Sequence, residues 1–257
     1  MSFRFALEVE YDGTHASGWQ VQPGEPTIQG ALEEALGSLC GHKVHVAGAG
    51  RTDAGVHALG QIAAFSTHAS RTERAIRDGL NGTLPDFVSC IRAWRVADEF
   101  DPRRWSHGKH YRYRWLERRA RSPLRAHRAW HHRGPRLAVD QMQSAAEHLA
   151  GTYDLSCFRA SGCSATSTVR TIDSAAVRRV GDEVVLDIVG HGFLRHTVRI
   201  MAGTLLEVGL GRREADRFPA LIASKNRELA GRTAPAHGLT LVSVRLGDGP
   251  RRYTPEG

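Results

Sequence analysis

Residues 48–58 read Gly48-Ala49-Gly50-Arg51-Thr52-Asp53-Ala54-Gly55-Val56-His57-Ala58. Each of the three glycines costs about 0.5–1 kcal/mol inside a regular element, so the stretch is a poor helix and a poor strand. Glycine allows backbone shapes and close approaches that other residues forbid, which suits a loop that holds a charged group at a cleft. We therefore expect a rigid loop here, with Asp53 as its single acidic side chain.

The charges of this stretch leave two interpretations open. If the backbone is extended around Thr52, then Arg51 and Asp53 project to the same side, and a carboxylate beside a guanidinium stays ionised at neutral pH. The loop would then present a functional carboxylate. Alternatively, the stretch is a glycine-rich turn with a surface ion pair, which would contribute little to stability.

The flanking residues predict regular elements in the order β-α-β-β-α-β, which is the ferredoxin-like arrangement. Phe3 to Tyr11 alternates apolar and polar residues, as a half-buried strand does and a signal peptide does not. The remaining elements are a helix from the Thr27 cap to Gly41, strands at 43–47 and 61–67, a helix opened by the capping box Ser70-Arg71-Thr72-Glu73, and a strand at 88–96.

The second half of the chain has a similar order of elements. It predicts strands at 109–117, 168–180, 183–190 and 239–246, a helix capped by Asp140 with Gln143, and helices at 194–208 and 214–224. We expect an α+β protein of two ferredoxin-like halves, residues 1–105 and 106–257, with a boundary near 101–107. Their sheets are expected to join across a central basic cleft.

Composition points to a polyanionic partner. The chain has 257 residues and a formal charge of +8, which favours nucleic acid as a ligand. Four cysteines are too few for a disulfide scaffold and indicate a reducing compartment. Since no apolar run is long enough to span a membrane, we expect a cytoplasmic protein.

The positive charge is concentrated between Arg103 and Arg136. This strip contains twelve Lys or Arg residues, five histidines and the single acid Glu117. Aromatic residues, among them Tyr111 and Tyr113, are interleaved with the cations. Cations neutralise phosphates and rings stack on bases, so this combination favours RNA binding over a merely solvated charged face.

The stretch 48–58 resembles the active-site signature of the TruA-type tRNA pseudouridine synthases, and Asp53 matches the catalytic aspartate of that family. Further matches follow in the same order, so that the resemblance runs from Tyr11 to about Val244. They are Gly18-Trp19-Gln20, Lys109-His110-Tyr111-Arg112-Tyr113, Phe158-Arg159-Ala160, Val169-Arg170-Thr171 and Gly192 to Gly203.

This resemblance implies roles for individual residues. Tyr111 would stack on the target base, although a pair such as Tyr111 and Tyr113 more commonly fills a core. Arg199 would pair with Asp53, although such an arginine can also extend to solvent. The family often has Asn after this arginine, where this chain has Ile200.

The substrate-binding set that the resemblance implies consists of Arg51, Lys109, Tyr111 and Arg170. Arg51 would fill the space that a flipped base leaves or grip its phosphate. Arg170 would contact RNA or support the cleft. Asp53 would act as a nucleophile or as a base, and the sequence does not choose between these roles.

The implied reaction is isomerisation of uridine to pseudouridine at positions 38–40, in the anticodon stem-loop of tRNA, by a homodimer. It exchanges no atoms or electrons with other molecules, so we expect no cofactor. Fourteen histidines suggest metal binding, but the chain lacks H-E-x-x-H and C-x-x-C motifs, and we expect no metal. The alternatives are a non-catalytic RNA-binding protein and a pseudouridine synthase that acts on another RNA.

Overall fold

The computed structural model describes residues 2–163 and 165–249 of the chain. They belong to two compact units. The first unit extends to His107 and includes the chain again from Thr240, whereas the second runs from Gly108 to Leu239. The predicted halves 1–105 and 106–257 therefore differ from the units at the C-terminal strand. This strand belongs to the first unit, in which Thr240 pairs with His57 and Leu241 with Ala58.

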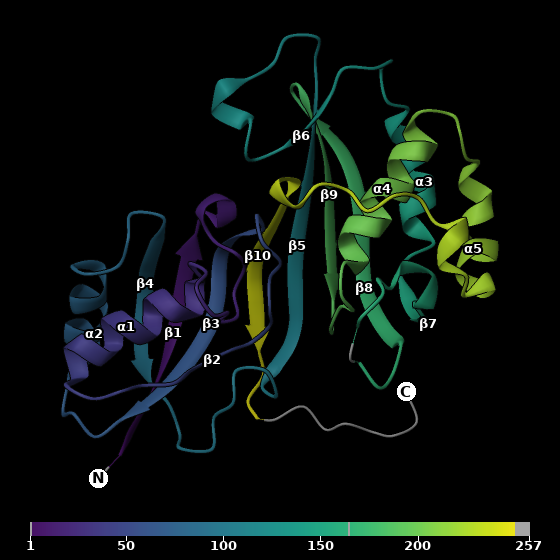
Figure 1. Cartoon of the computed structure of the whole chain (residues 1–257). Coiled ribbons are helices and arrows are strands. Elements are labelled where there is room, and N and C mark those ends of the chain that lie inside the picture. Colours follow the sequence, from purple (N-terminus) through teal and green to yellow (C-terminus); the bar gives the residue numbers. More distant parts are fainter. Residues whose placement is uncertain (1, 164, 250–257) are drawn as a thin grey trace. The chain divides into compact units, whose positions relative to one another are not determined.

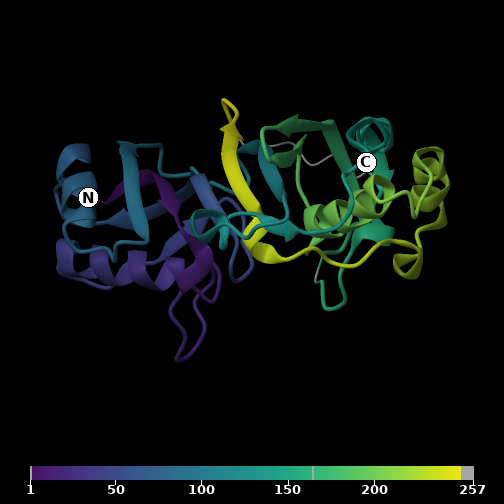
Figure 2. The ribbon, with the colours of Figure 1, turned by 90° about the horizontal axis from the view of Figure 1, so that it is seen from above.

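The first unit is a sheet with two helices. Its elements are β1 (Phe3–Tyr11), α1 (Ile28–Cys40), β2 (Val46–Gly48), β3 (His57–Thr67), α2 (Glu73–Asn81), β4 (Val88–Arg95) and β10 (Leu239–Leu246). Strand β1 lies between β4 and β3, and β2 pairs with β3, all antiparallel, while β10 pairs with β3 in parallel. Up to β4, the elements follow the predicted order β-α-β-β-α-β. Helix α1 runs along the sheet and contacts α2 (Figures 1 and 2).

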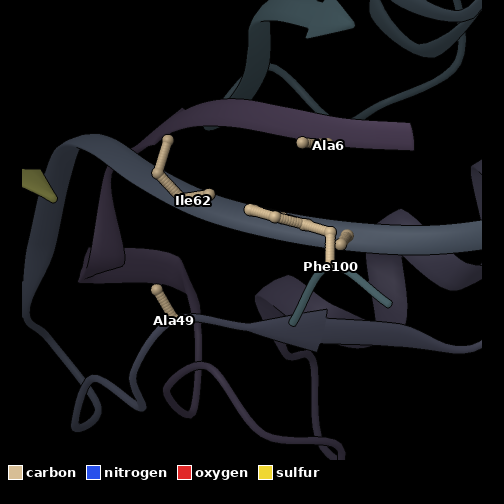
Figure 3. Close-up of a cluster of buried hydrophobic side chains, with 5 residues drawn as sticks. Ala6, Ala49, Ile62 and Phe100 are labelled. Atoms are coloured by element: carbon tan, nitrogen blue, oxygen red, sulfur yellow. The ribbon is translucent and has the colours of Figure 1, made fainter. Parts of the chain in front are cut away.

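Alternation along β1 builds a core on each of its faces. Phe5 points to one side, where its ring stacks on Phe65 of β3 with 5.6 Å between the ring centroids. Ala6 points to the other side and joins a buried cluster with Ile62 and Phe100. Figure 3 shows this cluster, which also includes Ala49 from the glycine-rich loop. The loop is therefore attached to the core of the first unit.

The predicted limits of α1 are confirmed, because local side-chain chemistry sets them. The hydroxyl of Thr27 accepts a hydrogen bond from the amide of Gly30, and Gly41 ends the helix with φ of 75°. The predicted capping box of α2 is wrong. Thr72, and not Ser70, caps that helix, and the Glu73 carboxylate accepts a hydrogen bond from the amide of Arg95.

The second unit also combines strands and helices. Its elements are β5 (Ser106–Glu117), β6 (Trp130–His132), α3 (Val139–Glu147), β7 (Gly151–Asp154), β8 (Val169–Val180), β9 (Glu183–Gly190), α4 (Thr197–Gly209) and α5 (Phe218–Ser224). The strands follow the antiparallel order β5-β9-β8-β7, with β6 parallel to β5. Helices α3 and α4 contact each other, and α3 packs on β8 (Figure 1). β6 and β7 were not predicted, since strands this short have too little alternation to detect.

The predicted cap of α3 is also wrong. The helix begins after Ala138, which makes no side-chain capping bond. Gln143 is committed elsewhere, because its side-chain oxygen accepts a hydrogen bond from the amide of Val177 on β8. The side chain that was expected to cap the helix instead ties the helix to the sheet.

Thr27→Ala should lower the free energy of unfolding by about 1 kcal/mol, because the amide of Gly30 loses its acceptor at the start of α1. Thr27→Ser retains the hydroxyl and should stay close to the wild type. Urea denaturation of the three proteins measures the difference. Equal losses in the two variants would show that the methyl group of Thr27, and not the cap, carries the effect.

Candidate active site

The glycine-rich stretch is shorter as a loop than the sequence suggested. Gly48 closes β2 and His57 opens β3, so the irregular segment covers residues 49–56. The start of the segment is hydrogen-bonded to β3, and its end continues directly into that strand. The amide of Ala49 donates to the carbonyl of Ile62 at 2.7 Å, and the Gln61 side-chain amide donates to the carbonyl of Gly50 at 2.8 Å. The loop that carries Asp53 is therefore held by its neighbouring strand.

Thr52, next to Asp53 in the sequence, is fixed through both its side chain and its backbone. Its buried hydroxyl forms a 2.8 Å hydrogen bond with the hydroxyl of Tyr11. Its carbonyl accepts a 3.0 Å hydrogen bond from the amide of Trp19. Burial raises the pKa of Tyr11 to about 12, against the smaller effects of its hydrogen bonds with Thr52 and Gln61. The Tyr11 hydroxyl therefore remains neutral at physiological pH.

Two close backbone approaches require glycine beside this loop. A Cβ on Gly13 would overlap the carbonyl of Val56, and a Cβ on Gly18 would lie 2.8 Å from the carbonyl oxygen of Thr52. Gly18 also has a φ of 98°, which other residues rarely adopt. The segment Gly18-Trp19-Gln20 is one of the motifs that resemble the pseudouridine synthase family. Part of its local role is to hold the backbone of Thr52.

A second polar group supports the start of β3. His57 is buried, and its Nδ1 atom lies 3.2 Å from the amide nitrogen of Gly13 and 3.0 Å from a carboxylate oxygen of Asp12. The same carboxylate accepts hydrogen bonds from the amide and hydroxyl of Thr14. The sequence indicated only a turn at Tyr11-Asp12-Gly13. The alternation of Phe3 to Tyr11, which places Tyr11 on the inner face of β1, is the sequence signal that could have included this turn in the site.

Within this loop, Asp53 is half-buried and Arg51 is exposed. Asp53 also bonds to its own loop through its backbone, because its carbonyl accepts a 3.1 Å hydrogen bond from the amide of Val56. The first unit therefore holds the candidate carboxylate on a fixed backbone. It leaves the side chain of Arg51 open to solvent, where it could meet a large ligand.

The second unit carries the other predicted site residues. Tyr111 on β5 is only 8% exposed, and its ring meets that of Phe193 edge to face, with 5.3 Å between the centroids. The neighbouring tyrosine on the same face, Tyr113, is fully buried, and its hydroxyl donates to the carbonyl of Pro235 at 2.9 Å. Tyr113 is thus committed to the core, whereas the ring of Tyr111 lies against the segment that precedes α4.

Arg199 is fixed by a contact that the sequence did not reveal. Its Nε donates to the carbonyl of Ala234 at 2.9 Å, and the amide of Ala234 donates to the carbonyl of Arg199 at 3.0 Å. The side chain is half-buried. These two bonds hold both the backbone and the guanidinium of Arg199 against the segment before β10.

Lys109, Tyr111 and Arg170 come together around the end of β9. Gly190 pairs with Lys109 on one side and with Ile172 on the other. Arg170 lies on β8 close to the following turn, since a Cβ on Gly192 would be 3.7 Å from its side chain. Arg170 also donates to the carbonyl of Val169 at 2.5 Å. Three of the predicted residues therefore belong to one small region of the second unit.

The basic strip is less available for RNA than its composition suggested. Asp187 of β9 binds Arg112 through both oxygens at 2.8 and 3.1 Å, and it lies 2.6 Å from His110. Burial would raise the pKa of Asp187, but the hydrogen bonds from Arg112 and His110 outweigh it and lower that pKa. Further cations of the strip pair with the acids of the β8–β9 turn, namely Arg114 with Glu183, Arg118 with Asp182, and Arg125 with both. These acids lie outside the strip in sequence.

Across 2–163 and 165–249, no group of three or more His, Cys, Asp or Glu side chains is arranged to hold a metal ion. Over the same residues, every helix falls short of the length and apolar character that crossing a membrane requires.

Comparisons with known proteins agree with the motifs. A family model described as tRNA pseudouridine synthase matches residues 8–103 and 145–246. The tRNA pseudouridine synthase A of Myxococcus xanthus is 51% identical over 255 residues, which cover 99% of this chain and 96% of that protein. The protein of the same name from Geotalea uraniireducens is 47% identical over 238 residues, or 93% of this chain and 97% of that protein.

Among solved structures, the crystal structure of the archaeal box H/ACA sRNP Nop10-Cbf5 complex contains a similar chain. It aligns with a TM-score of 0.32 and 13% sequence identity, over 79% of this chain and 54% of that chain.

Tyr11→Phe should change how stability depends on pH. The folded protein keeps the Tyr11 proton up to about pH 12, whereas the unfolded chain loses it near pH 10. The raised pKa therefore stabilises the folded wild type fully below pH 10. This stabilisation is lost as pH rises toward 12, by up to about 1.4 kcal/mol per pH unit. Between about pH 9 and 11, the free energy of unfolding, measured with urea, should fall by about 1.4 kcal/mol less in the variant than in the wild type. Parallel decreases in the two proteins would contradict a buried Tyr11 hydroxyl.

Proposed function

Because this chain belongs to the tRNA pseudouridine synthase family, and is thus an isomerase that forms pseudouridine in tRNA, we propose that it modifies uridines 38–40 of the anticodon stem-loop. The choice of positions follows from the family motifs. The observation that carries the chemical part of the proposal is Asp53 itself, a half-buried carboxylate on a loop fixed at Ala49, Gly50 and Thr52.

The reaction needs such a fixed carboxylate. The bond between N1 of uracil and C1′ of ribose breaks, the base turns in place, and a new bond forms between C5 and C1′. C5 then loses its proton and N1 gains one, so the reaction is an isomerisation. Positive character develops at C1′ when the first bond breaks, and a held carboxylate can stabilise or attack that carbon, by analogy with glycoside hydrolysis. Asp53 takes this role, as a nucleophile or as the base that starts an elimination. No atoms enter or leave, so the isomerisation requires no cofactor.

Tyr111 holds the detached uracil in this proposal. A ring that stacks on the base keeps it in the site until C5 reaches C1′, and thereby prevents net loss of the base. Support comes from the fixed position of Tyr111, whose ring meets Phe193 edge to face and is therefore oriented before the substrate arrives. Tyr113 is excluded from this role because its hydroxyl and ring belong to the core.

Arg199 acts as the partner of Asp53 in this proposal. An arginine next to a carboxylate attracts it and fixes its direction through charge-assisted hydrogen bonds. The family motif supports the pairing, and the two hydrogen bonds between Arg199 and Ala234 supply the rigidity that such a partner needs.

Arg51, Lys109 and Arg170 contact the RNA. A paired uridine must leave its helix, at a cost of a few kcal/mol, before its ribose can reach a carboxylate. Arg51 is exposed on the catalytic loop and can fill the vacated space or bind the neighbouring phosphate. Lys109 and Arg170 lie near Tyr111 in the second unit and offer charge to the phosphates beside the target nucleotide.

The setting of the enzyme completes the proposal. We place it in the cytoplasm, where the free thiols of Cys40, Cys90, Cys157 and Cys163 suit a reducing environment. We also propose a homodimer, which light scattering of the purified protein would test. The ferredoxin-like origin of both halves is supported by the antiparallel order β4-β1-β3-β2 in the first unit and by the antiparallel pairs β5-β9 and β9-β8 in the second.

Asp53→Ala should abolish pseudouridine formation and leave tRNA binding intact. The expected loss of rate is roughly 10⁴-fold or more, as found when a catalytic nucleophile or its base is removed. Pseudouridine mapping on unmodified tRNA measures both rate and position, and filter binding measures affinity. Asp86→Asn, which changes an exposed acid of the first unit, is the matched control. Turnover near the wild-type rate would remove Asp53 from its role, and modification outside positions 38–40 would refute the assigned substrate.

Arg199→Leu should lower the maximal rate of pseudouridine formation, because Asp53 loses the cation that orients it in this proposal. Arg199→Lys retains the charge and should keep more of the rate, even though the bond from Nε to Ala234 is lost. Pseudouridine mapping on unmodified tRNA measures the rates of both variants. A Leu variant that works at the wild-type rate would argue against the pair.

A further inference from the structure

The second unit contains a pocket whose residues have no part in the proposed chemistry. Its volume is about 430 Å³. One wall is the strand β6 and the turn that follows it, and the opposite wall is the C-terminal half of α4. The lining includes Trp130, Arg133, Glu207, Arg212 and Arg232.

The pocket has an excess of positive charge. Three guanidinium groups line it, and Glu207 is the one acidic side chain among the lining residues that the structure describes. The carboxylate of Glu207 is already occupied, since one of its oxygens accepts hydrogen bonds from Arg213 at 2.9 and 3.2 Å. The one acid of the lining, Glu207, is therefore paired with an arginine outside the lining.

Arg212 and Arg232 carry most of this unbalanced charge. Both are exposed, and neither forms a side-chain hydrogen bond or ion pair within residues 2–163 and 165–249. The guanidinium of Arg232 lies 4.5 Å from the centroid of the Trp130 ring, so a cation–π contact holds it in place. A third guanidinium, that of Arg133, makes only a long contact of 3.4 Å with His131.

The backbone of the pocket is well fixed. Strand β6 pairs with β5, with Trp130 opposite Trp115 and His131 opposite Leu116. On the other wall, α4 is held beside the segment of Arg232, because the amide of Gly231 donates to the hydroxyl of Thr204 at 2.9 Å. The segments that carry Trp130 and Arg232 are therefore hydrogen-bonded to regular elements of the second unit.

The pocket lies away from the proposed base-stacking residue of the same unit. Along β5, Trp115 follows Tyr111 by four residues, a separation of roughly 13 Å in a strand. Along α4, Leu206 of the pocket follows Arg199 by seven residues, roughly 10 Å of helix. A group bound in the pocket therefore belongs to a different nucleotide from the one whose base meets Tyr111.

We infer that this pocket binds backbone phosphate of the tRNA at a position remote from the target uridine. Arg212 and Arg232 would neutralise the phosphate, and the inference rests on the proposed function. Guanidinium groups match phosphate oxygens in geometry and charge, and a neighbouring ring suits a nucleic acid better than a small free anion. The pocket adds affinity and orientation, and it takes no part in bond breaking.

The test compares two double variants that remove the same charge. Arg212→Gln/Arg232→Gln removes the two unpaired arginines. Arg74→Gln/Arg217→Gln removes two exposed arginines that are paired with Asp78 and Glu214. Affinity for an unmodified tRNA transcript is measured by filter binding over a range of NaCl concentrations. Pseudouridine formation is measured at saturating tRNA.

The pocket variant should bind tRNA roughly tenfold more weakly near physiological salt, and the slope of log K against log [salt] should be shallower by about 1–2. Its rate at saturation should equal that of the wild type. Arg212→Lys/Arg232→Lys should restore the slope, because lysine also neutralises phosphate. If the pocket variant and the control have the same affinity and slope, the pocket inference is overturned.

The same binding measurement with the isolated anticodon stem-loop distinguishes two positions of the bound phosphate. If the pocket variant binds both RNAs more weakly than the wild type, the phosphate lies in the stem-loop. If it binds only the full tRNA more weakly, the phosphate lies in the tRNA body; either result supports the pocket. Failure of the proposed function is distinguishable, because the wild type would then form no pseudouridine at positions 38–40 of the same transcript.

Discussion

The hydrogen bond between the hydroxyls of Tyr11 and Thr52 is the constraint on which the candidate site depends most. A glycine-rich segment has more conformational freedom than any other, so a carboxylate placed on it is not held still unless its neighbours fix it. Thr52 is bound at its hydroxyl by Tyr11 and at its carbonyl by Trp19. Ala49, at the start of the segment, is buried in the core of the first unit (Figure 3). The glycines therefore permit close approach without leaving the loop free.

The second unit achieves the same result with side chains rather than with a loop. Tyr111 is oriented by the ring of Phe193, and Arg199 is attached to Ala234 through its guanidinium and its backbone. The cations around them fall into two groups. Arg112 and its neighbours are neutralised by acids of β9 and the β8–β9 turn, and they stabilise the sheet. Others, such as Arg212, carry charge that remains for a ligand.

What the sequence could predict was set by local chemistry. The alternation of Phe3 to Tyr11 and the caps Thr27 and Gly41 act within a few residues, and the structure has these elements where they were expected. Some misses were contacts between distant residues: Gln143 binds Val177 on another element. Likewise, Asp187 neutralises Arg112. Other misses were local, because Thr72 and not Ser70 caps α2, and because β6 and β7 are too short to show alternation. In the site, the motifs supplied the residue names, but the contacts of Thr52 and Arg199 join segments that no spacing in the sequence relates.

The return of β10 to the first unit has a consequence for biosynthesis. Thr240 pairs with His57, directly after the loop that carries Asp53, although the two residues are far apart in the sequence. A chain leaves the ribosome N-terminus first, and contacts of such long range form late. The edge of β3 beside the candidate carboxylate therefore stays uncovered until β10 has been synthesised. A product truncated before β10 would lack this strand and would leave the first unit incomplete.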